Sequence, residues 1–499
     1  MNPETRRVQR EMERLAWGVA LAAVFVIAVR APRVLPDTWW HLRTGQWVWQ
    51  HRTWPTHDPF SFTRYGAPWS PPGPPVQVLM YGLFRLGGLW ALDVGTGLLA
   101  VAGLAFLMAA LRAQDEGAPL LRAATVVWSA LTATVYWAAR PHMVTFVLAA
   151  WFLWALETHR LGHAGFRRLW TLPPLLAFWA NAHGGFIVGP LLVAAYAVPA
   201  LARRLRAVGW RRLPGDPTAR AWAVLGLALL VAPVLNPTGP ARWLYPFQTV
   251  GMRLLRAHIA EWQPPQVSAP ALWPFLAWWF GLVLALGLSR RGLPAEHLLL
   301  WLGLGALAWS AVRHVALFAL AAALVWHLPA AAALRRFPRG NRCAPRAARA
   351  RPALNTALLV ALALAALLTS WQPYATGQRQ VYVQETYPVA AVRFLQRTRP
   401  RARLFNHYDW GAYLLWAWPE QKVFIDGRTD LYGDPLLQEY LTVVRAEPGW
   451  QEVLARWGID TILAAPDWPL LRVLPRAGWV EVYADGHAAV WVRTARPGR

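Results

Sequence analysis

Long apolar stretches recur along this chain, and short arginine-rich segments separate them. Residues 15–29, 89–111, 271–288 and 353–368 carry almost no charge. A helix needs about 20 apolar residues to cross a hydrocarbon core about 30 Å thick. No soluble core needs so many such stretches, so the pattern predicts an α-helical polytopic membrane protein.

Marking every apolar stretch predicts about eleven transmembrane helices. Residues 1–371 then form a transmembrane domain with a long first outer loop at 31–88 and another outer loop at 236–270. The spans are expected near residues 15–31, 89–111, 121–138, 142–158, 168–180, 184–202, 219–235, 271–289, 296–312, 314–333 and 353–371.

The character of the sequence changes after residue 371, where short β-like runs alternate with helical ones. This alternation predicts a small soluble α/β domain over 372–499. The region has no glycine-rich phosphate loop and no nucleophile elbow, so it declares no chemistry by itself. The expected strands are 403–405, 422–425, 460–463, 479–483 and 488–492, and the expected helices are 388–398, 435–445 and 449–457.

The charge pattern predicts the orientation of the chain. It has 499 residues, a net charge of +25 and 15% charged residues, where a soluble domain has about 25%. Arginines concentrate in the loops 203–220 and 335–351, and basic loops stay cytoplasmic. An odd number of spans then places the N-terminus in the cytoplasm and the C-terminal domain outside a cell (plasma) membrane. Nucleic-acid binding is excluded because no basic patch lies on a soluble module, and the single cysteine, Cys343, can form no internal disulfide.

Two carboxylates mark the first outer loop. Residues 39–51 have the spacing of an interfacial helix, and residues 76–86 form an apolar segment that is interfacial or re-entrant. Asp37 precedes this helix and would be able to accept a proton from an acceptor group, or it would cap a helix beginning at Thr38 or Trp39; the two roles are compatible. Asp58, before a proline, opens a turn, or it binds a cation or orients a substrate.

Basic residues are expected at the outer ends of several spans. They are Arg140, His142, His183, Arg313 and His314. Together they would form a positive pocket that faces the Asp37 loop and grips a phosphate in bidentate fashion. The alternative for each one is snorkelling or a backbone hydrogen bond.

Three further features complete this polar set. Glu261 beside Trp262 would meet a sugar or line the surface. Residues 236–239 begin a turn, and Glu157 is expected to end its helix in cytoplasmic water.

The motifs together resemble the GT-C superfamily of polyprenyl-phosphate-sugar-dependent, mannosyltransferase-like membrane glycosyltransferases, and within it a largely uncharacterised bacterial subgroup. The residues that carry the resemblance are 36–45, 58–63, Trp69, 236–237, 261–262, 406–411 and 424–428. The resemblance implies a GT-C-like fold with Asp37 as general base and with basic residues around the lipid phosphate. Many members have two acidic residues close together in this loop, whereas Thr-Trp-Trp follows Asp37 here. The second acidic role would then fall to Asp58.

The leading hypothesis is therefore a membrane hexosyltransferase that moves a sugar from a polyprenyl-phosphate donor, held among membrane lipids, to a glycan, lipid or protein acceptor at the outer face. The alternatives are a transporter or flippase of a lipid-linked or anionic substrate and a non-catalytic scaffold. No cofactor and no metal ligand is assigned, although a divalent metal is compatible with the reaction. The predicted substrate-binding residues are His41, Asp58, Arg140, His142, His183, Glu261, Arg313 and His314.

Overall fold

The computed structural model of the chain describes residues 3–30, 35–71, 73–114, 118–336, 351–398 and 402–494. Cys343 and most of the arginine-rich segment 335–351 lie outside the described residues. Contacts divide the chain into two compact units. We call Met1–Pro32, Asp93–Pro246 and Ala260–Trp371 the helical unit, and Arg33–Leu92, Phe247–Ile259 and Gln372–Arg499 the mixed unit.

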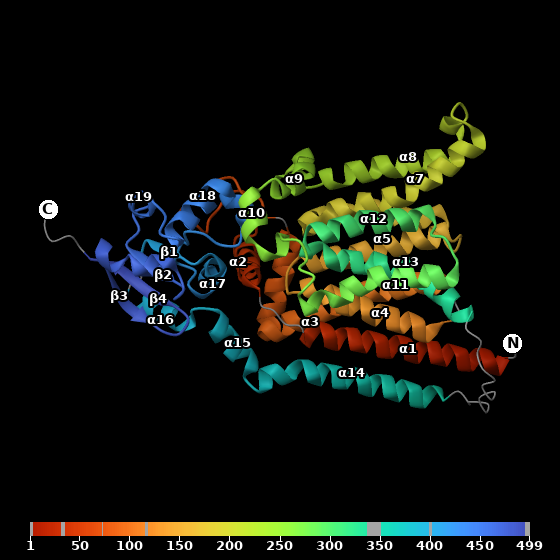
Figure 1. Cartoon of the computed structure of the whole chain (residues 1–499), viewed down its shortest axis with the longest axis horizontal. Helices are drawn as coiled ribbons and strands as arrows, with labels where there is room; N and C mark the ends of the chain where they lie inside the picture. Colours follow the sequence, from red (N-terminus) through yellow and green to blue (C-terminus); the bar gives the residue numbers. More distant parts are fainter. Residues whose placement is uncertain are drawn as a thin grey trace. The chain divides into compact units, whose positions relative to one another are not determined.

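The helical unit is a bundle in which the labelled helices run nearly along one direction (Figure 1). Its helices are α1 (Pro3–Arg30), α4 (Pro119–Ala133), α5 (His142–Arg160), α6 (Leu172–Ala182), α7 (Val188–Val208), α8 (Pro217–Val231), α11 (Trp273–Ser289), α12 (Ala295–Ser310), α13 (Val315–Arg336) and most of α14 (Pro352–Ala375). Three helices contribute residues to both units: α3 (Pro74–Gln114), α9 (Tyr245–Val250) and α14.

Helix α13 forms the centre of the bundle. It packs against α4, α11 and α12, and every residue from 315 to 325 is buried. Because many of these residues are alanines, the neighbouring helices approach closely and their large side chains fill the space between them. Trp128 of α4 stacks on Trp278 of α11 with ring centroids 3.7 Å apart, and Trp278 Nε1 donates a hydrogen bond of 2.9 Å to Thr132 Oγ1.

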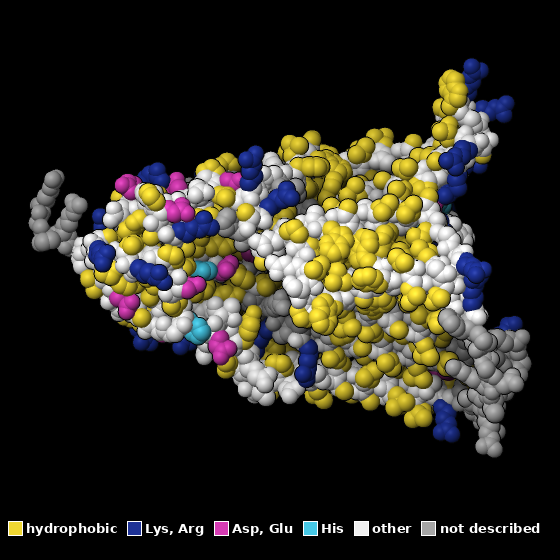
Figure 2. All heavy atoms as spheres, in the orientation of Figure 1, with side chains coloured by type: hydrophobic (Ala, Val, Ile, Leu, Met, Phe, Trp, Pro, Cys, Tyr) yellow, Lys and Arg dark blue, Asp and Glu magenta, His cyan; other side chains and the backbone are white. Residues whose placement is uncertain are grey.

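Seven helices among the described residues are long and apolar enough to cross a membrane. These seven segments correspond to the helices α1, α3, α7, α8, α11, α13 and α14, and each overlaps with one of the predicted spans. The other four predicted spans coincide with α4, α5, α6 and α12, so the count of eleven stays a prediction. The face of the bundle in Figure 2 is broadly hydrophobic, and its dark-blue basic side chains gather toward the helix ends. Residues such as Phe280, 77% exposed, and Val283, 73% exposed, contribute to this apolar surface, which suits contact with lipid. The predicted polytopic membrane protein is confirmed.

The mixed unit is built around a small four-stranded sheet (Figure 1). The strand order is β1-β2-β4-β3, with β1 parallel to β2 and the other neighbours antiparallel. The strands are β1 (Leu404–Asn406), β2 (Thr461–Ala464), β3 (Trp479–Ala484) and β4 (Ala489–Arg493). The helices are α2 (Pro36–His51), α10 (Arg253–His258), α15 (Gln378–Thr386), α16 (Val389–Thr398), α17 (Tyr408–Ala417), α18 (Thr429–Val444) and α19 (Trp450–Arg456).

Four of the five predicted strands are confirmed, and so are the predicted helices, as α16, α18 and α19. The predicted strand 422–425 is wrong. This segment lies beside β1, but the side chain of Asn406 stands where a backbone ladder would be: Phe424 N donates to Asn406 Oδ1 at 2.9 Å, and Asn406 Nδ2 donates to Ile425 O at 2.8 Å. Only Val423 forms a β-bridge there, with Ser61. Helix α17 was not predicted.

The predicted helix 39–51 is confirmed as α2. Residues 76–86 are predicted to be separate from the span that follows. The structure has a break between the two, because α3 is interrupted at Gly87 and at Gly88, whose φ is +59°. The interfacial position of these segments stays a prediction. So does the division into a transmembrane domain ending at 371 and an outer domain from 372.

A buried ion cluster joins the first predicted outer loop to the C-terminal region inside the mixed unit. Arg428 donates to Asp426 through Nε and Nη2, at 2.9 and 2.7 Å, and to Asp58 Oδ1 through Nη1 at 2.6 Å. The hydroxyl of Tyr432 donates to Asp426 Oδ2 at 2.8 Å. All four side chains are at most 1% exposed. Burial lowers the pKa of Arg428, but Asp426, Tyr432 and Asp58 together outweigh burial, so the pKa lies well above its usual range.

The same loop is held by a turn and by backbone contacts. The backbone N–H groups of Phe60 and Ser61 donate to the Asp58 carboxylate, each at 3.0 Å, so the predicted turn at Asp58 is confirmed. The guanidinium of Arg428 lies over the Trp69 ring, 4.7 Å from its centroid. Thr63 Oγ1 donates to Phe424 O at 2.6 Å. The loop is therefore part of the core of the mixed unit.

We expect Arg428→Met to lower the free energy of unfolding by about 3–5 kcal/mol, because two buried carboxylates then lose their cation. The measurement is thermal or denaturant unfolding of the full chain in detergent. Arg456→Met is the matched control, since Arg456 is 59% exposed in its pair with Glu439 and such a pair contributes about 0–1 kcal/mol. Equal losses in the two variants would show that the buried cluster is not a main support of the unit.

Candidate functional site

Asp37 lies in the first turn of α2. The helix begins at Pro36, and its N-cap is Leu35, whose side chain makes no capping hydrogen bond. The predicted capping role of Asp37 is therefore wrong: proline suits the first helical position, so the helix starts before Thr38. A carboxylate in the first turn is favoured by the helix dipole, and Asp37 is half-buried.

The Asp37 carboxylate lies against the turn at Gly427. A Cβ atom on Gly427 would overlap Asp37 Oδ1, and it would lie 3.3 Å from Asp37 Cγ and 3.5 Å from Trp40 Nε1. Helix α2 packs against α17, which brings Tyr408 close enough for the Asp37 charge to contribute to raising the Tyr408 pKa, after burial as the largest cause. The motifs 36–45, 406–411 and 424–428 thus meet in one place.

His41 and Asp58 have partners inside the mixed unit. His41 is 4% exposed, and its Nδ1 accepts a hydrogen bond of 2.9 Å from Gln77 Nε2, since an amide nitrogen can only donate. Asp58 belongs to the buried ion cluster with Arg428. Both side chains therefore support the position of α2 and its loop, and their predicted contact with substrate stays a prediction.

A second group of predicted residues meets in the helical unit around Glu261. This carboxylate lies in the 3₁₀ helix η7 (Ala260–Trp262). Arg140 Nη1 donates to Glu261 Oε2 at 2.9 Å, and Arg313 Nη1 lies 3.5 Å from Glu261 Oε1. The Arg313 guanidinium also lies over the Trp262 ring, 4.0 Å from its centroid. Burial raises the pKa of Glu261, but Arg140 and then Arg313 outweigh burial and lower it to about 2.

Two predicted histidines adjoin this pair of arginines. His142 Nε2 donates to Tyr136 O at 2.6 Å, and the Tyr136 ring lies within 6 Å of both the Arg140 and the Arg313 guanidinium. The His183 ring is 6.3 Å from that of His142. His142 is 5% exposed, and its Nδ1 has no hydrogen-bond partner among the described residues. A neutral imidazole that donates through Nε2 keeps Nδ1 as an acceptor.

His183 and His314 are oriented by backbone groups. His183 Nδ1 accepts from Gly185 N at 3.0 Å. His314 Nδ1 bonds Leu307 O at 2.9 Å, and both Arg313 and Glu261 act on it electrostatically. The structure therefore brings all five predicted basic residues and Glu261 into one neighbourhood. That these residues face the Asp37 loop stays a prediction.

Arg242 is a further buried cation near this group that the sequence analysis missed. It lies in η6 (Gly239–Leu244) and is 3% exposed, with its guanidinium 4.8 Å from the ring centroid of Tyr245 and 5.5 Å from that of Phe186. The turn at Asn236 is tied to the end of α6 because Asn236 Nδ2 donates to Asn181 Oδ1 at 2.9 Å. The only signal in the sequence was an arginine shortly after a predicted turn.

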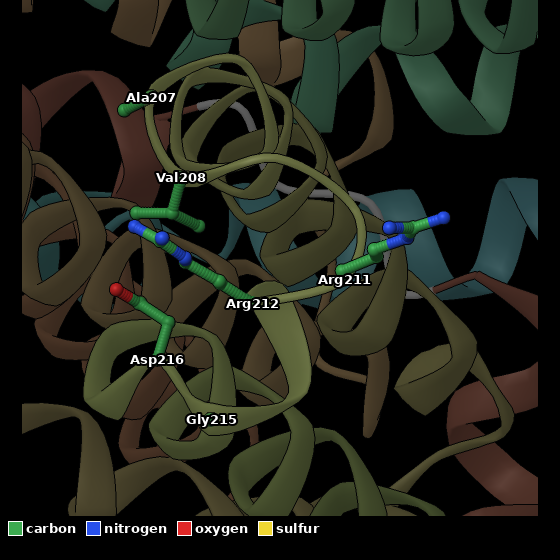
Figure 3. Close-up of a pocket in the computed structure, with 6 residues that line it drawn as sticks. All are labelled: Ala207, Val208, Arg211, Arg212, Gly215 and Asp216. Carbon is green, nitrogen blue, oxygen red and sulfur yellow. The ribbon is translucent and has the colours of Figure 1, made fainter.

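A surface cavity lies elsewhere, in the connection between α7 and α8 (Figure 3). Its lining residues are Ala207, Val208, Arg211, Arg212, Gly215 and Asp216. The side chains of Arg211 and Arg212 point in different directions, and none of the predicted site residues lines it. Among the residues that the structure describes, no His, Cys, Asp and Glu side chains are grouped as metal ligands would be.

The sequence matches no family model and no curated protein. The structure is similar to the apo oligosaccharyltransferase of Archaeoglobus fulgidus, with a TM-score of 0.56 and 13% identity over 91% of this chain and 69% of that one. It is also similar to ArnT from Cupriavidus metallidurans bound to undecaprenyl phosphate, with a TM-score of 0.48 and 14% identity over 96% of this chain and 98% of that one. For the mycobacterial arabinofuranosyltransferase AftD the TM-score is 0.45 with 15% identity, over 97% of this chain and 40% of that one.

The likeness to the archaeal enzyme extends over most of this chain, although the two sequences share few residues. The similarity lies in the course of the backbone. The motifs of the sequence had predicted a fold of this kind. The chain therefore shares its overall fold with the archaeal oligosaccharyltransferase.

Proposed function

We propose that this chain is a membrane glycosyltransferase that moves a sugar from a polyprenyl-phosphate donor to an acceptor hydroxyl, with Asp37 as the general base. The observation that carries the proposal is the placement of Asp37. In a chain with the GT-C fold, a half-buried carboxylate occupies the first turn of α2 and is held against the turn at Gly427. A fixed carboxylate that stays partly open to solvent is suited to receive a proton.

The reaction proposed is a single displacement at the anomeric carbon of the donor. The acceptor oxygen forms a bond to that carbon while the bond from the carbon to the phosphate oxygen breaks, and its electron pair leaves with the phosphate. The acceptor proton passes to the Asp37 carboxylate. Attack from the side opposite the phosphate inverts the configuration of the anomeric carbon, and the product is a glycoside together with a polyprenyl phosphate.

The arginine cluster of the helical unit is proposed to hold the donor phosphate. Two guanidinium groups, those of Arg140 and Arg313, lie beside the carboxylate of Glu261, and two cations so close together would attract an anion. Guanidinium groups bind phosphate oxygens in bidentate fashion. His142 and His183 border the same place and would orient the phosphate further.

A transporter would carry its ionisable residues near the bilayer midplane. Helix α5 instead has its two polar clusters near its ends. Arg140 and His142 lie at its start. Near its other end, Glu157 is fully buried, accepting from Arg160 Nη2 at 2.6 Å and lying 3.2 Å from His297 Nε2. The expectation that Glu157 lies in water is wrong, because α5 continues past it and α12 covers it. At about 1.5 Å per residue the two clusters are roughly 22 Å apart along the helix, which favours a transferase over a transporter.

We expect Asp37→Asn to lower kcat by at least about 100-fold, because a general base contributes about 10²–10⁴-fold. The assay is transfer of labelled sugar from a panel of polyprenyl-phosphate donors by the purified full chain. Asp430→Asn is the matched control, since Asp430 also lies in the first turn of a helix, α18, but is exposed; its activity should stay within about twofold of wild type. Full activity of Asp37→Asn would refute Asp37 as the general base. Absence of transfer with every donor would refute the proposal that the chain is a glycosyltransferase of this kind.

The Glu261 carboxylate should contribute stability that depends on pH. Its folded-state pKa, about 2, lies below the unfolded value of about 4.3, so its contribution is complete above the unfolded pKa and is lost as the pH falls through the folded one. We expect Glu261→Gln to lower the free energy of unfolding by a few kcal/mol at pH 7 and by progressively less below about pH 4. Denaturant unfolding at several pH values measures this difference. The exposed Glu481→Gln serves as the control, and a loss for Glu261→Gln that is constant from pH 7 to pH 3 would contradict the ion cluster.

A further inference from the structure

We propose that Gly427 is a positioning residue for the Asp37 carboxylate, so that the C-terminal turn 426–428 forms one wall of the site of sugar transfer. The chemical part of this inference rests on the proposed function of Asp37. Its geometric part concerns two residues of the mixed unit and holds for any function of that unit.

The space beside Gly427 is occupied by the Asp37 carboxylate. A Cβ atom there would overlap Asp37 Oδ1 and would lie 3.3 Å from Asp37 Cγ. The φ of Gly427 lies outside the left-handed region, so its backbone conformation is open to any residue. Glycine is therefore required here by the closeness of Asp37 and not by the shape of the turn. The atom that a side chain would displace belongs to the carboxylate that is proposed to receive the proton.

The turn that carries Gly427 is fixed on both sides. Arg428 N donates to Asp426 Oδ1 at 2.9 Å, which closes the turn around Gly427. The Asp426 side chain is itself held by the Arg428 guanidinium and by Tyr432. Because these three side chains are at most 1% exposed, the turn has little freedom to move away. The buried ion cluster thus transmits its rigidity to the wall beside Asp37.

Helix α2 is fixed equally well from the other side. Trp39 packs edge-on against Tyr413 of α17, with centroids 5.5 Å apart. Helix α17 in turn approaches the segment before the turn through a second glycine: a Cβ on Gly411 would overlap Ile425 O and lie 2.9 Å from Asp426 Cα. Two glycines therefore let α2, α17 and the segment 424–428 meet, and Asp37 stands where they converge.

A disulfide test addresses the geometry without using activity. The variant Asp37→Cys/Gly427→Cys is made in a Cys343→Ser background, so that the pair is the only pair of thiols. A sulfur in the place of Asp37 Cγ would lie near 3.3 Å from the Cβ at 427, close to the separation of about 3 Å that a disulfide requires. We expect mild oxidation to cross-link this pair, with the linked peptide identified by mass spectrometry. The control pair is Asp37→Cys/Gly486→Cys, because Gly486 has nothing within 4 Å of its Cβ position. A 37–427 pair that cross-links no better than the control overturns the proposal.

Measurements of enzyme activity then test whether Gly427 positions the Asp37 carboxylate. We expect Gly427→Ala to lower kcat by about 10–100-fold with KM for the donor within about twofold, because a shift of about 1 Å in a reacting group can cost about 100-fold. Gly486→Ala should leave both constants unchanged. The variant Asp37→Asn/Gly427→Ala should be no slower than Asp37→Asn alone, since both changes act through one carboxylate. Effects on kcat that multiply would overturn positioning, because a merely structural loss is independent of Asp37.

The remaining outcomes separate this inference from the proposed function. Full activity of Asp37→Asn would refute Asp37 as the general base. The cross-linking experiment would still show whether residues 37 and 427 are in contact. If Gly427→Ala folds poorly, Asp37→Ala/Gly427→Ala should recover the unfolding midpoint of Asp37→Ala, because removing the carboxylate removes the overlap. Failure of that recovery would overturn the proposal.

Discussion

The buried cluster of Asp58, Asp426 and Arg428 is the interaction on which the mixed unit depends. Its three charges are removed from water, and removing Arg428 would leave two buried carboxylates without a cation at a cost of several kcal/mol. Both carboxylates therefore depend on the same guanidinium. Because Asp58 and Arg428 are 370 residues apart, the cluster holds the loop after the first span against the C-terminal region. It also fixes the turn at Gly427, and through that turn the place of Asp37.

The helical unit uses charge in a different way. Glu261 neutralises one of the two positive charges of Arg140 and Arg313, and the arrangement stays ionised because the pKa of Glu261 lies at about 2. The cluster in the mixed unit has two carboxylates beside one guanidinium and is closed to water, whereas this one has two guanidinium groups beside one carboxylate and remains partly open. The first suits a structural role, and the second suits the binding of an anion.

Much of the architecture followed from local patterns. Apolar length predicted the helices of the bundle, and alternation predicted β1 to β4, because burial of a helix or strand face depends on residues close in sequence. Two of the errors arose where a side chain from another segment decided the outcome. Segment 422–425 is no strand because Asn406 takes the place of a ladder. Glu157 is buried because α12 supplies His297.

The sequence alone was sufficient to predict the membrane character, the bundle of apolar helices with a small C-terminal sheet and the polar residues of interest, since composition, period and motif are local properties. The tertiary structure decided how those residues are used. It joined Asp58 to Arg428, paired Glu261 with two arginines and added the buried Arg242. The role of Gly427 also became visible only in three dimensions, because the absence of a side chain matters only when a second segment, here the one that carries Asp37, fills the space. The apolar spans thus determined the fold of the bundle. Long-range electrostatics and steric fit determined the site.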